Sequence, residues 1–387
     1  MFKQSFQLMV LTLAHTIGDL FGGLLGAILP ALCSHFNLSL SAGLALITLM
    51  GMSSNVFQVL AGHVKIGGEK PWMISVGLLL ASLIPLIGLF PPGHSNLFGL
   101  AGLLILAGMG VAWIHPDGLR GIHELHRIPS SVSTAMFMVG GFAGFSSGAW
   151  LSGAVVEKWG LRGLPWLVPV AVVMALLVPL ARIRLSTAQT TSTPAAINSS
   201  VPSLHFGHLL AMGSLVAFSA VILTSLLPTY LFHLGFPMNV GGRSVFFFGL
   251  GGAAGSLFWG GVAHRKGYAL AFKASLAIGI PCLIAYLLLA KYPAAVWLLP
   301  VAGFSLYAAY PLIVTLSRFA RSRCDLGQRM GLIVGGCWGV AGIAVMALGP
   351  VGERIGLAPL LHLAWISYLA TLVYGGFMHL SLRQPVP

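Results

Sequence analysis

Residues 108–116 read Gly-Met-Gly-Val-Ala-Trp-Ile-His-Pro, and residues 303–311 read Gly-Phe-Ser-Leu-Tyr-Ala-Ala-Tyr-Pro. A Val-Gly-Gly-x-x-Gly stretch follows each of them, at 139–144 and at 334–339, so both pairs are 195 residues apart (303 − 108 and 334 − 139). Leu-Pro at 29–30 and Gly at 51 return at 227–228 and 249, a spacing of 198 (227 − 29 and 249 − 51). Four matches in the same order indicate an internal repeat, and the chain is therefore predicted to consist of two related halves.

The composition indicates that both halves lie in a bilayer. The 387 residues include only 20 Lys and Arg and 7 Asp and Glu, 57% are hydrophobic, and the mean hydropathy is +0.94. In soluble domains about a quarter of the residues are charged. Because a helical crossing uses roughly 20 apolar residues, the length accommodates about twelve crossings and excludes a soluble enzyme core. The net charge of +13 comes from basic residues scattered singly through short loops, so no nucleic-acid partner is expected.

Apolar runs bounded by Pro, Gly and charged residues predict six spans in each half. The expected fold is an all-α integral membrane protein with twelve transmembrane helices in two pseudo-symmetric six-helix bundles, residues 1–182 and 207–387. Between them, residues 183–206 include a polar stretch that cannot bury enough apolar surface to fold alone, and they are expected to form a linker. The predicted spans are 7–33, 40–62, 71–91, 97–118, 130–154, 164–182, 207–230, 241–262, 270–290, 295–317, 330–350 and 358–380.

The distribution of basic residues predicts the orientation. With the N-terminus inside, 15 of the 20 Lys and Arg residues fall on the inner side, so both termini and the linker are expected in the cytoplasm. The first apolar run reaches Cys33, which is too long for a signal peptide, and it is expected to remain as the first helix. The four cysteines lie far apart and indicate neither a disulfide framework nor a thiolate metal site.

Glycines recur at every fourth residue in three spans and make one smooth face on each helix. Such faces let helices approach closely in lipid, so we expect them to serve helix packing. The alternative is that smooth faces let helices slide while the protein changes conformation. The residues concerned are Gly22 and Gly26 in the first span, Gly140 and Gly144 in the fifth, and Gly335 and Gly339 in the eleventh.

Asp19 is the one acid of seven that lies well inside an apolar span. A buried carboxylate costs several kcal/mol unless it is paired or protonated, which makes it a candidate functional group. His15 precedes it by four residues, one helical turn away on the same face. Such a pair can share or exchange a proton, and we expect it to couple transport to protons. The structural alternative is a polar pair that only holds the first span to a neighbour.

A second polar cluster stands at the inner end of the fourth span. It contains His115, Asp117 and, one turn further, Arg120. Pro116 lacks a backbone N–H, so the helix is predicted to bend or break there and to free carbonyl groups beside the histidine. These residues are expected to contribute to a gate or to bind substrate. For His115 and Asp117, a helix-capping role is an equal alternative.

Other polar and aromatic residues are candidates for the wall of a cavity. Asn55 and Gln58 are about one turn apart in the second span, where amides also serve as hydrogen bonds between helices. Tyr310 stands where the first half has His115, and Tyr230 ends the seventh span. Trp113 lies within reach of the same region. No zinc-protease motif or nucleotide-binding loop is found in the sequence, so no enzymatic activity, catalytic residue, metal or cofactor is expected.

Several stretches resemble the fosmidomycin resistance branch of the major facilitator superfamily. The resemblance is carried by His15-x-x-x-Asp19, Ile28-Leu29-Pro30, Ile47-Thr48-Leu49, Gln58, Lys70-Pro71-Trp72, Ile114-His115-Pro116-Asp117-x-x-Arg120 and Val139-Gly140-Gly141. It implies a proton-driven antiporter of the bacterial inner membrane that exports an antibiotic or another small organic compound. Met138 and Phe142 replace the amides that usually flank the Val-Gly-Gly of that branch, and residues 62–70 lack the usual Asp, so the usual gating lock of that loop is not expected.

These observations predict a secondary transporter that works by alternating access, with protons and a small-molecule substrate as partners in a lipid bilayer. A monomer is expected. One rival keeps the fold and changes the cargo to a divalent metal or metal chelate bound by His15, Asp19, His115 and Asp117. A second rival is a membrane sensor that transports nothing.

Overall fold

The computed structural model describes residues 2–63, 68–186, 204–324 and 326–377. In the first half, the helices are α1 Phe2–Gly22, α2 Leu24–Ala27, α3 Leu29–Phe36, α4 Leu40–His63, α5 Trp72–Ala81, η1 Ile84–Leu89, η2 His94–Asn96, α6 Leu97–His123, α7 Ser130–Trp159, η3 Leu161–Leu167 and α8 Val168–Leu180. In the second half they are α9 Phe206–His233, α10 Met238–Lys266, α11 Tyr268–Leu289, η4 Pro293–Trp297, α12 Leu298–Leu306, α13 Ala309–Ser317, α14 Leu326–Gly331, η5 Leu332–Gly336, α15 Cys337–Ala347, α16 Gly349–Ile355 and α17 Ala358–Phe377. The elements η1 to η4 are 3-10 helices, and η5 is a π-helix.

The prediction of an all-α fold with twelve transmembrane helices is confirmed. The described residues contain 12 helical segments that are long and apolar enough to cross a membrane. Several are longer than the apolar runs predicted, because helix continues past the first polar residue at the end of the run. The fourth span, for example, reaches His123 instead of residue 118.

The first span, predicted over 7–33, ends earlier than expected and contains more than one helix. Helix α1 ends at Gly22, and α2 and α3 follow after single-residue interruptions at Gly23 and Ile28. Pro30 lies in the first turn of α3, where a missing N–H is tolerated. A candidate membrane span therefore covers only Lys3–Ala27. The hydropathy of the sequence stays high across these interruptions, because every residue around them is apolar or small, and it therefore did not indicate them.

The predicted break at Pro116 is also absent. Helix α6 continues through this residue to His123. Proline removes a single donor, and neighbouring groups in a packed membrane protein can satisfy the freed carbonyl, so a transmembrane helix tolerates it.

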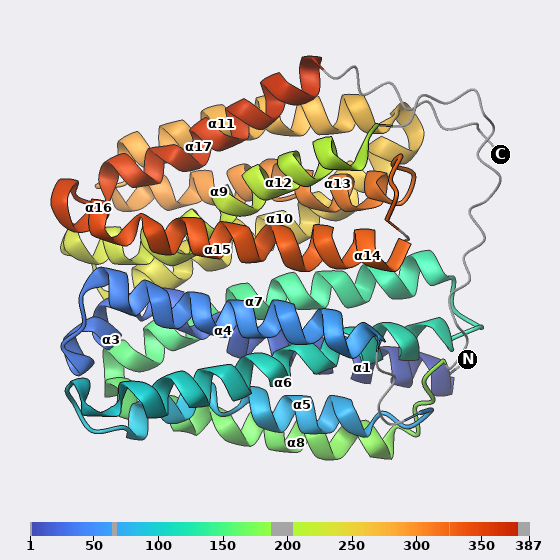
Figure 1. Cartoon of the computed structure of the whole chain (residues 1–387), viewed down its shortest axis with the longest axis horizontal. Coiled ribbons are helices and arrows are strands. Elements are labelled where there is room, and N and C mark those ends of the chain that lie inside the picture. The colour runs from blue at the N-terminus through green and yellow to red at the C-terminus, as the bar shows by residue number, and fades with distance from the viewer. Residues whose placement is uncertain (1, 64–67, 187–203, 325, 378–387) are drawn as a thin grey trace.

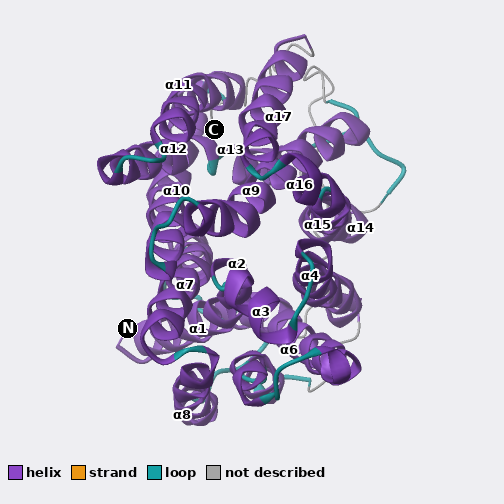
Figure 2. Ribbon diagram, turned by 90° about the vertical axis from the view of Figure 1, so that its left-hand side faces the viewer, coloured by secondary structure: helices purple, strands orange, loops and turns teal. Residues whose placement is uncertain are grey.

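The two halves lie side by side and meet along two pairs of helices. Figure 2 shows the lower group of helices, α1 to α8, against the upper group, with α7 beside α10 and α4 beside α15. Backbones approach closely along the first pair, where a Cβ on Gly242 would lie 2.2 Å from the Ala149 carbonyl oxygen. The helix axes run roughly parallel, with α3 and α16 at one end of the molecule (Figure 1).

The ends of the predicted linker pack against the bundles. Ile183 and Leu185 are buried in a cluster of first-half residues, and the Leu185 N–H donates to the Glu69 carbonyl. At the other end, the Phe206 N–H donates to the Arg321 carbonyl. The apolar side chains at 183 and 185 thus extend the first bundle beyond residue 182. The remainder of the linker, 187–203, lies outside the described residues.

Candidate functional site

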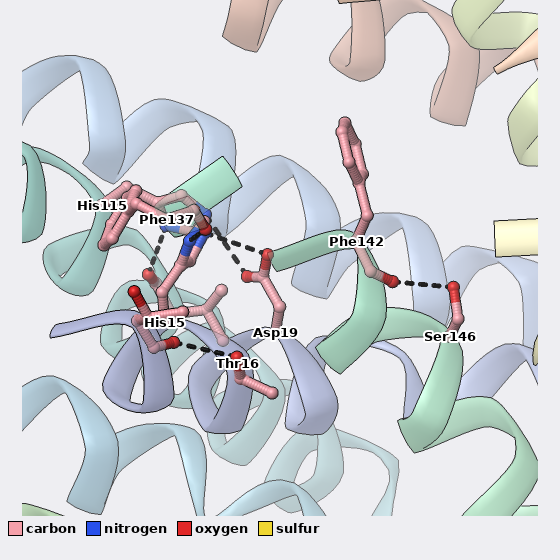
Figure 3. A network of polar contacts seen from close by, with 9 residues as sticks. His15, Thr16, Asp19, His115, Phe137, Phe142 and Ser146 are labelled. Atoms are coloured by element: carbon pink, nitrogen blue, oxygen red, sulfur yellow. Dashed lines mark hydrogen bonds and ion pairs between the residues drawn. The ribbon is translucent and has the colours of Figure 1, made fainter. Parts of the chain in front are cut away.

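The structure brings His15, Asp19 and His115 together inside the first half. The His15 Nε2 lies 3.2 Å from the Asp19 Oδ2, and the His115 Nε2 lies 3.3 Å from the Asp19 Oδ1. The two imidazole rings meet edge to face with centroids 4.7 Å apart. Figure 3 shows both rings directed toward the one carboxylate, which therefore has a histidine at each oxygen. We refer to these three residues as the His-Asp-His cluster.

Close packing of α1 against α6 places the cluster. His15 and Asp19 are one turn apart on α1, and His115 comes from α6. Gly18 lies between them in the chain, and a Cβ there would lie 2.5 Å from the Ile114 Cδ1. The missing side chain at Gly18 therefore lets the next residue of α6, His115, reach Asp19.

Backbone carbonyls fix the orientation of both rings. The His15 Nδ1 is 2.7 Å from the Phe137 carbonyl oxygen, and the His115 Nδ1 is 2.9 Å from the Val111 carbonyl oxygen. A carbonyl oxygen can only accept a hydrogen bond, so both Nδ1 atoms must carry the hydrogen. In a neutral ring the Nε2 is then an acceptor, and here each Nε2 faces a carboxylate oxygen. Because two acceptors repel, the arrangement needs a proton or another cation between each Nε2 and Asp19.

The three side chains differ in exposure. The His15 side chain is 3% exposed, whereas those of Asp19 and His115 are 18% and 22% exposed. Phe137 of α7 covers His15, with the two rings stacked at a centroid distance of 4.0 Å. Asp19 and His115 thus present the accessible side of the cluster, and His15 closes its buried side.

Gly141 of α7 forms part of this site, which the sequence did not indicate. A Cβ at this position would lie 2.7 Å from the Asp19 Oδ2 and 2.5 Å from the His15 Cε1. Any side chain here would enter the cluster. The available signal was the second glycine of Val-Gly-Gly, which lies outside the every-fourth-residue pattern of Gly140 and Gly144.

Tyr307 is a second residue that sequence reasoning missed. It belongs to the second half, between α12 and α13, and its ring meets that of Phe142 edge to face at 5.1 Å. It is buried, and its ring also meets that of Phe248 edge to face at 5.5 Å. Figure 3 shows the Phe142 ring pointing away from the cluster. Phe142 and Tyr307 thus join the two halves beside the cluster.

The structure separates Asp117 and Arg120 from His115. The Arg120 Nη1 donates to the Asp117 Oδ1 at 2.8 Å, its Nη2 to the Gly68 carbonyl at 2.6 Å, and its Nε to the Ser186 carbonyl at 2.8 Å. Arg120 thus binds one residue of its own helix and the backbone at two other places in the first half. This cluster therefore fastens the loop after α4 and the chain after α8 to the end of α6.

The other candidate wall residues lie apart from the cluster. Tyr310 is buried in the second half, where its hydroxyl donates to the Ile333 carbonyl and its ring meets Trp338 edge to face at 5.2 Å. Tyr230 packs against the same core. Trp113 faces α5, with its Cβ 3.5 Å from the Cβ position of Gly77. Asn55 and Gln58 are half-buried on α4, and within the described part of the chain neither forms a hydrogen bond.

Five of the six glycines of the smooth faces lie where two helices pack against each other. Those of α7 face α1, where a Cβ on Gly144 would lie 2.0 Å from the Thr16 carbonyl oxygen. Gly26, in the first half, faces α9 of the second half, and a Cβ on Gly26 would lie 2.5 Å from the Thr224 carbonyl oxygen. A Cβ on Gly22 would have no neighbouring atom within 4 Å. The remaining three are Gly140, 2.8 Å from the Thr12 Cγ2, Gly335, 3.4 Å from the Asn55 carbonyl oxygen, and Gly339, 3.0 Å from the Met52 Sδ.

Comparison with known proteins assigns the family. A sequence model of the Major Facilitator Superfamily matches residues 11–323. The chain belongs to this superfamily. It is therefore a multi-pass membrane transporter, in agreement with the twelve spans and the two halves of the fold.

Two curated relatives of this transporter are similar over most of their length. The chain is 24% identical to the fosmidomycin resistance protein of Escherichia coli, over 89% of this chain and 86% of that protein. It is also 24% identical to the uncharacterized MFS-type transporter YfnC of Bacillus subtilis, over 95% of this chain and 91% of that protein.

Solved structures share the fold at low sequence identity. A bacterial homologue of the human lysosomal transporter Spinster, in an inward-facing and occupied conformation, has a TM-score of 0.67 and 16% identity, covering 97% of this chain and 95% of that one. The nucleoside transporter NupG has a TM-score of 0.69 and 13% identity, covering 96% of this chain and 99% of that one.

Proposed function

We propose that the protein is a proton-coupled exporter of a small organic compound in the bacterial inner membrane, with both termini in the cytoplasm. The observation that carries the proposal is the His-Asp-His cluster. Two imidazoles, each with its Nδ1 held by a carbonyl, direct both Nε2 atoms at one carboxylate inside a membrane span. The fosmidomycin resistance protein among the relatives supports export of a small compound.

The cluster is suited to bind and release protons in turn. With a proton between Asp19 and each imidazole, the contacts are charge-assisted and the negative charge is offset. When protons leave, the carboxylate faces two acceptors at the edge of an apolar interior, which is unfavourable unless water or a cationic cargo enters. Since Asp19 and His115 keep partial exposure, the exchange occurs on that side of the cluster.

Proton exchange at this site can drive alternating access. The two halves of such transporters rock against each other and open one cavity to each side in turn. Phe142 and Tyr307 join the halves beside the cluster, and they offer an aromatic surface to a small organic cargo. A cargo that competes with protons for the same state would be exchanged for them.

Asp19→Asn tests the proposal in proteoliposomes. The amide mimics the neutral, protonated carboxyl, so the variant should fold and exchange labelled cargo downhill. It should lose uphill transport driven by a proton gradient, because it has no group there to release a proton. Glu124→Gln, an equivalent change in the loop after α6, is the matched control. Uphill transport by Asp19→Asn at the wild-type rate would refute the assignment of Asp19.

A divalent metal is the second candidate cargo. The three residues of the cluster offer ligand atoms within 4.8 Å of one another, and imidazole and carboxylate are ligands that divalent transition metals accept. Asp117, the fourth ligand expected from the sequence, is paired with Arg120 instead. Zn²⁺ or Mn²⁺ entry into dye-loaded vesicles, abolished by His115→Ala, would favour this cargo. Proton movement that needs an organic compound and no added metal would favour export. A sensor would show neither flux.

A further inference from the structure

Two glutamates connect the halves at the end of the molecule where α3 and α16 lie. The Glu353 Oε1 of α16 accepts hydrogen bonds from the Ser41 N–H at 2.9 Å and the Ser41 hydroxyl at 2.8 Å, in the first turn of α4. The Glu157 Oε2 of α7 accepts from the Asn239 N–H at 2.8 Å, in the first turn of α10. Each contact crosses from one half to the other.

The two contacts repeat one another in detail. A glycine stands one turn before each glutamate and meets the same residue of the opposite half. A Cβ on Gly153 would lie 3.3 Å from the Asn239 Cα, and one on Gly349 would lie 2.7 Å from the Ser41 Cα. Each motif then ends in a left-handed glycine that terminates its helix, at Gly160 and Gly356. The sequence pattern at both places is Gly-x-x-x-Glu-basic-x-Gly.

The spacing of the two motifs agrees with the internal repeat. The glutamates and the glycines before them are both 196 residues apart (353 − 157 and 349 − 153), and the donor residues Ser41 and Asn239 are 198 residues apart (239 − 41). The repeat spacings in the sequence are 195 and 198. The contacts are therefore related by the pseudo-symmetry of the fold. Glu157 and Glu353 are also the two acids that the charge count places on the outer side.

The physical basis of each contact is a carboxylate at a helix N-terminus. The first N–H groups of a helix lack partners within the helix, and the helix dipole favours negative charge there. The glycine lets the backbone approach closely enough for the carboxylate to reach the N–H. Because α4 and α10 are long transmembrane helices of opposite halves, separating the halves at this end must break both contacts.

We propose that the two Gly-x-x-x-Glu motifs form a paired clamp that holds the α3/α16 end closed and sets the balance between the two transport conformations. The inference rests on the proposed alternating-access function and, for the assignment of this end to the outside, on the charge count. Both glutamates are exposed, so salt screens the clamp. Both the Glu157 contact and the Glu353 contact stabilise the closed state, so loss of either one should shift the population toward the state that is open at this end.

Distance measurements between spin labels test the clamp without any cargo or proton gradient. Label pairs in a cysteine-free background would span the halves at each end: His94 with Lys291 at the clamp end, and His126 with Arg265 at the opposite end. Glu353→Ala should increase the population with a long distance at the clamp end several-fold, and should shorten the distance at the opposite end. Glu157→Ala should do so less, since it loses one hydrogen bond instead of two, and the double variant should do so most.

Two further variants keep the test decisive. Glu353→Gln retains an acceptor oxygen without the charge, so it should fold and give a smaller shift than Glu353→Ala. Glu124→Gln, an acid-to-amide change away from the clamp, should leave both distances unchanged. Wild-type distance distributions in folded Glu157→Ala and Glu353→Ala would overturn the clamp. Such a result would leave the proton-coupling role of Asp19 untouched, because that role is measured by uphill transport.

Discussion

Gly141→Ala is the substitution that tests the architecture of the His-Asp-His cluster most directly. The added methyl would lie 2.5 Å from the His15 Cε1 and 2.7 Å from the Asp19 Oδ2. Non-bonded carbon atoms prefer separations of about 3.5–4.0 Å, so the neighbours must move by about 1 Å. The backbone of α7 packs closely against two helices, against α1 at the Thr16 carbonyl and against α10 at Gly242, so we expect side chains to move before the helix does. The imidazole and the carboxylate must therefore give way.

The size of the effect follows from the contacts that are lost. Overpacking a tightly packed interior costs about 1–3 kcal/mol, so the amount of folded protein must be measured alongside transport. Displacing Asp19 opens its contacts with both histidines, and contacts to a charged group contribute about 1.5–3 kcal/mol each. Since about 1.4 kcal/mol corresponds to a factor of ten, loss of one such contact predicts a decrease of roughly tenfold to a hundredfold in proton-driven transport.

A matched control exists in the second half. Gly336 occupies the position equivalent to Gly141 (336 − 141 = 195), and a Cβ there meets only the Leu332 Cδ2, at 3.8 Å. Gly336→Ala should transport normally. Both variants would be compared for the amount of folded protein and for uphill transport in proteoliposomes at matched protein content. Equal transport by the two variants would refute the view that Gly141 keeps the cluster assembled.

The sequence predicted the members of the cluster, but not their assembly. Asp19 stood out because a carboxylate in an apolar run has few structural explanations, and His15 followed from helical spacing. His115 was found through the Pro motif and was grouped with Asp117. Two residues along a helix are about 200° apart around its axis, so His115 and Asp117 face different neighbours. Only the packing of α6 on α1 determines which of them reaches Asp19.

The fold could be predicted further than the site for a physical reason. Membrane spans depend on composition summed over about 20 residues, which tolerates local errors. The site depends on single atoms at single positions, such as the absent Cβ of Gly141 or the Tyr307 ring supplied by the other half. The clamp could be predicted in part. Its two motifs are readable in the repeat, whereas the helix N-termini that they bind lie far away in the sequence.

Two further predictions concern the membrane orientation and the Arg120 cluster. In a cysteine-free background, Lys291→Cys should react with an impermeant reagent added to intact cells, whereas His126→Cys should react only after lysis; the reverse pattern would invert the topology. Arg120→Ala leaves Asp117, which is 7% exposed, without its partner. Breaking a buried pair costs on the order of 3 kcal/mol, so the apparent melting temperature in detergent should fall, and the double variant Arg120→Ala with Asp117→Asn should recover much of the loss because no charge is left unpaired. Since Arg120 also holds the Gly68 and Ser186 carbonyls, recovery should be incomplete. A melting temperature for Arg120→Ala equal to that of the wild type would show that the buried charge finds another partner.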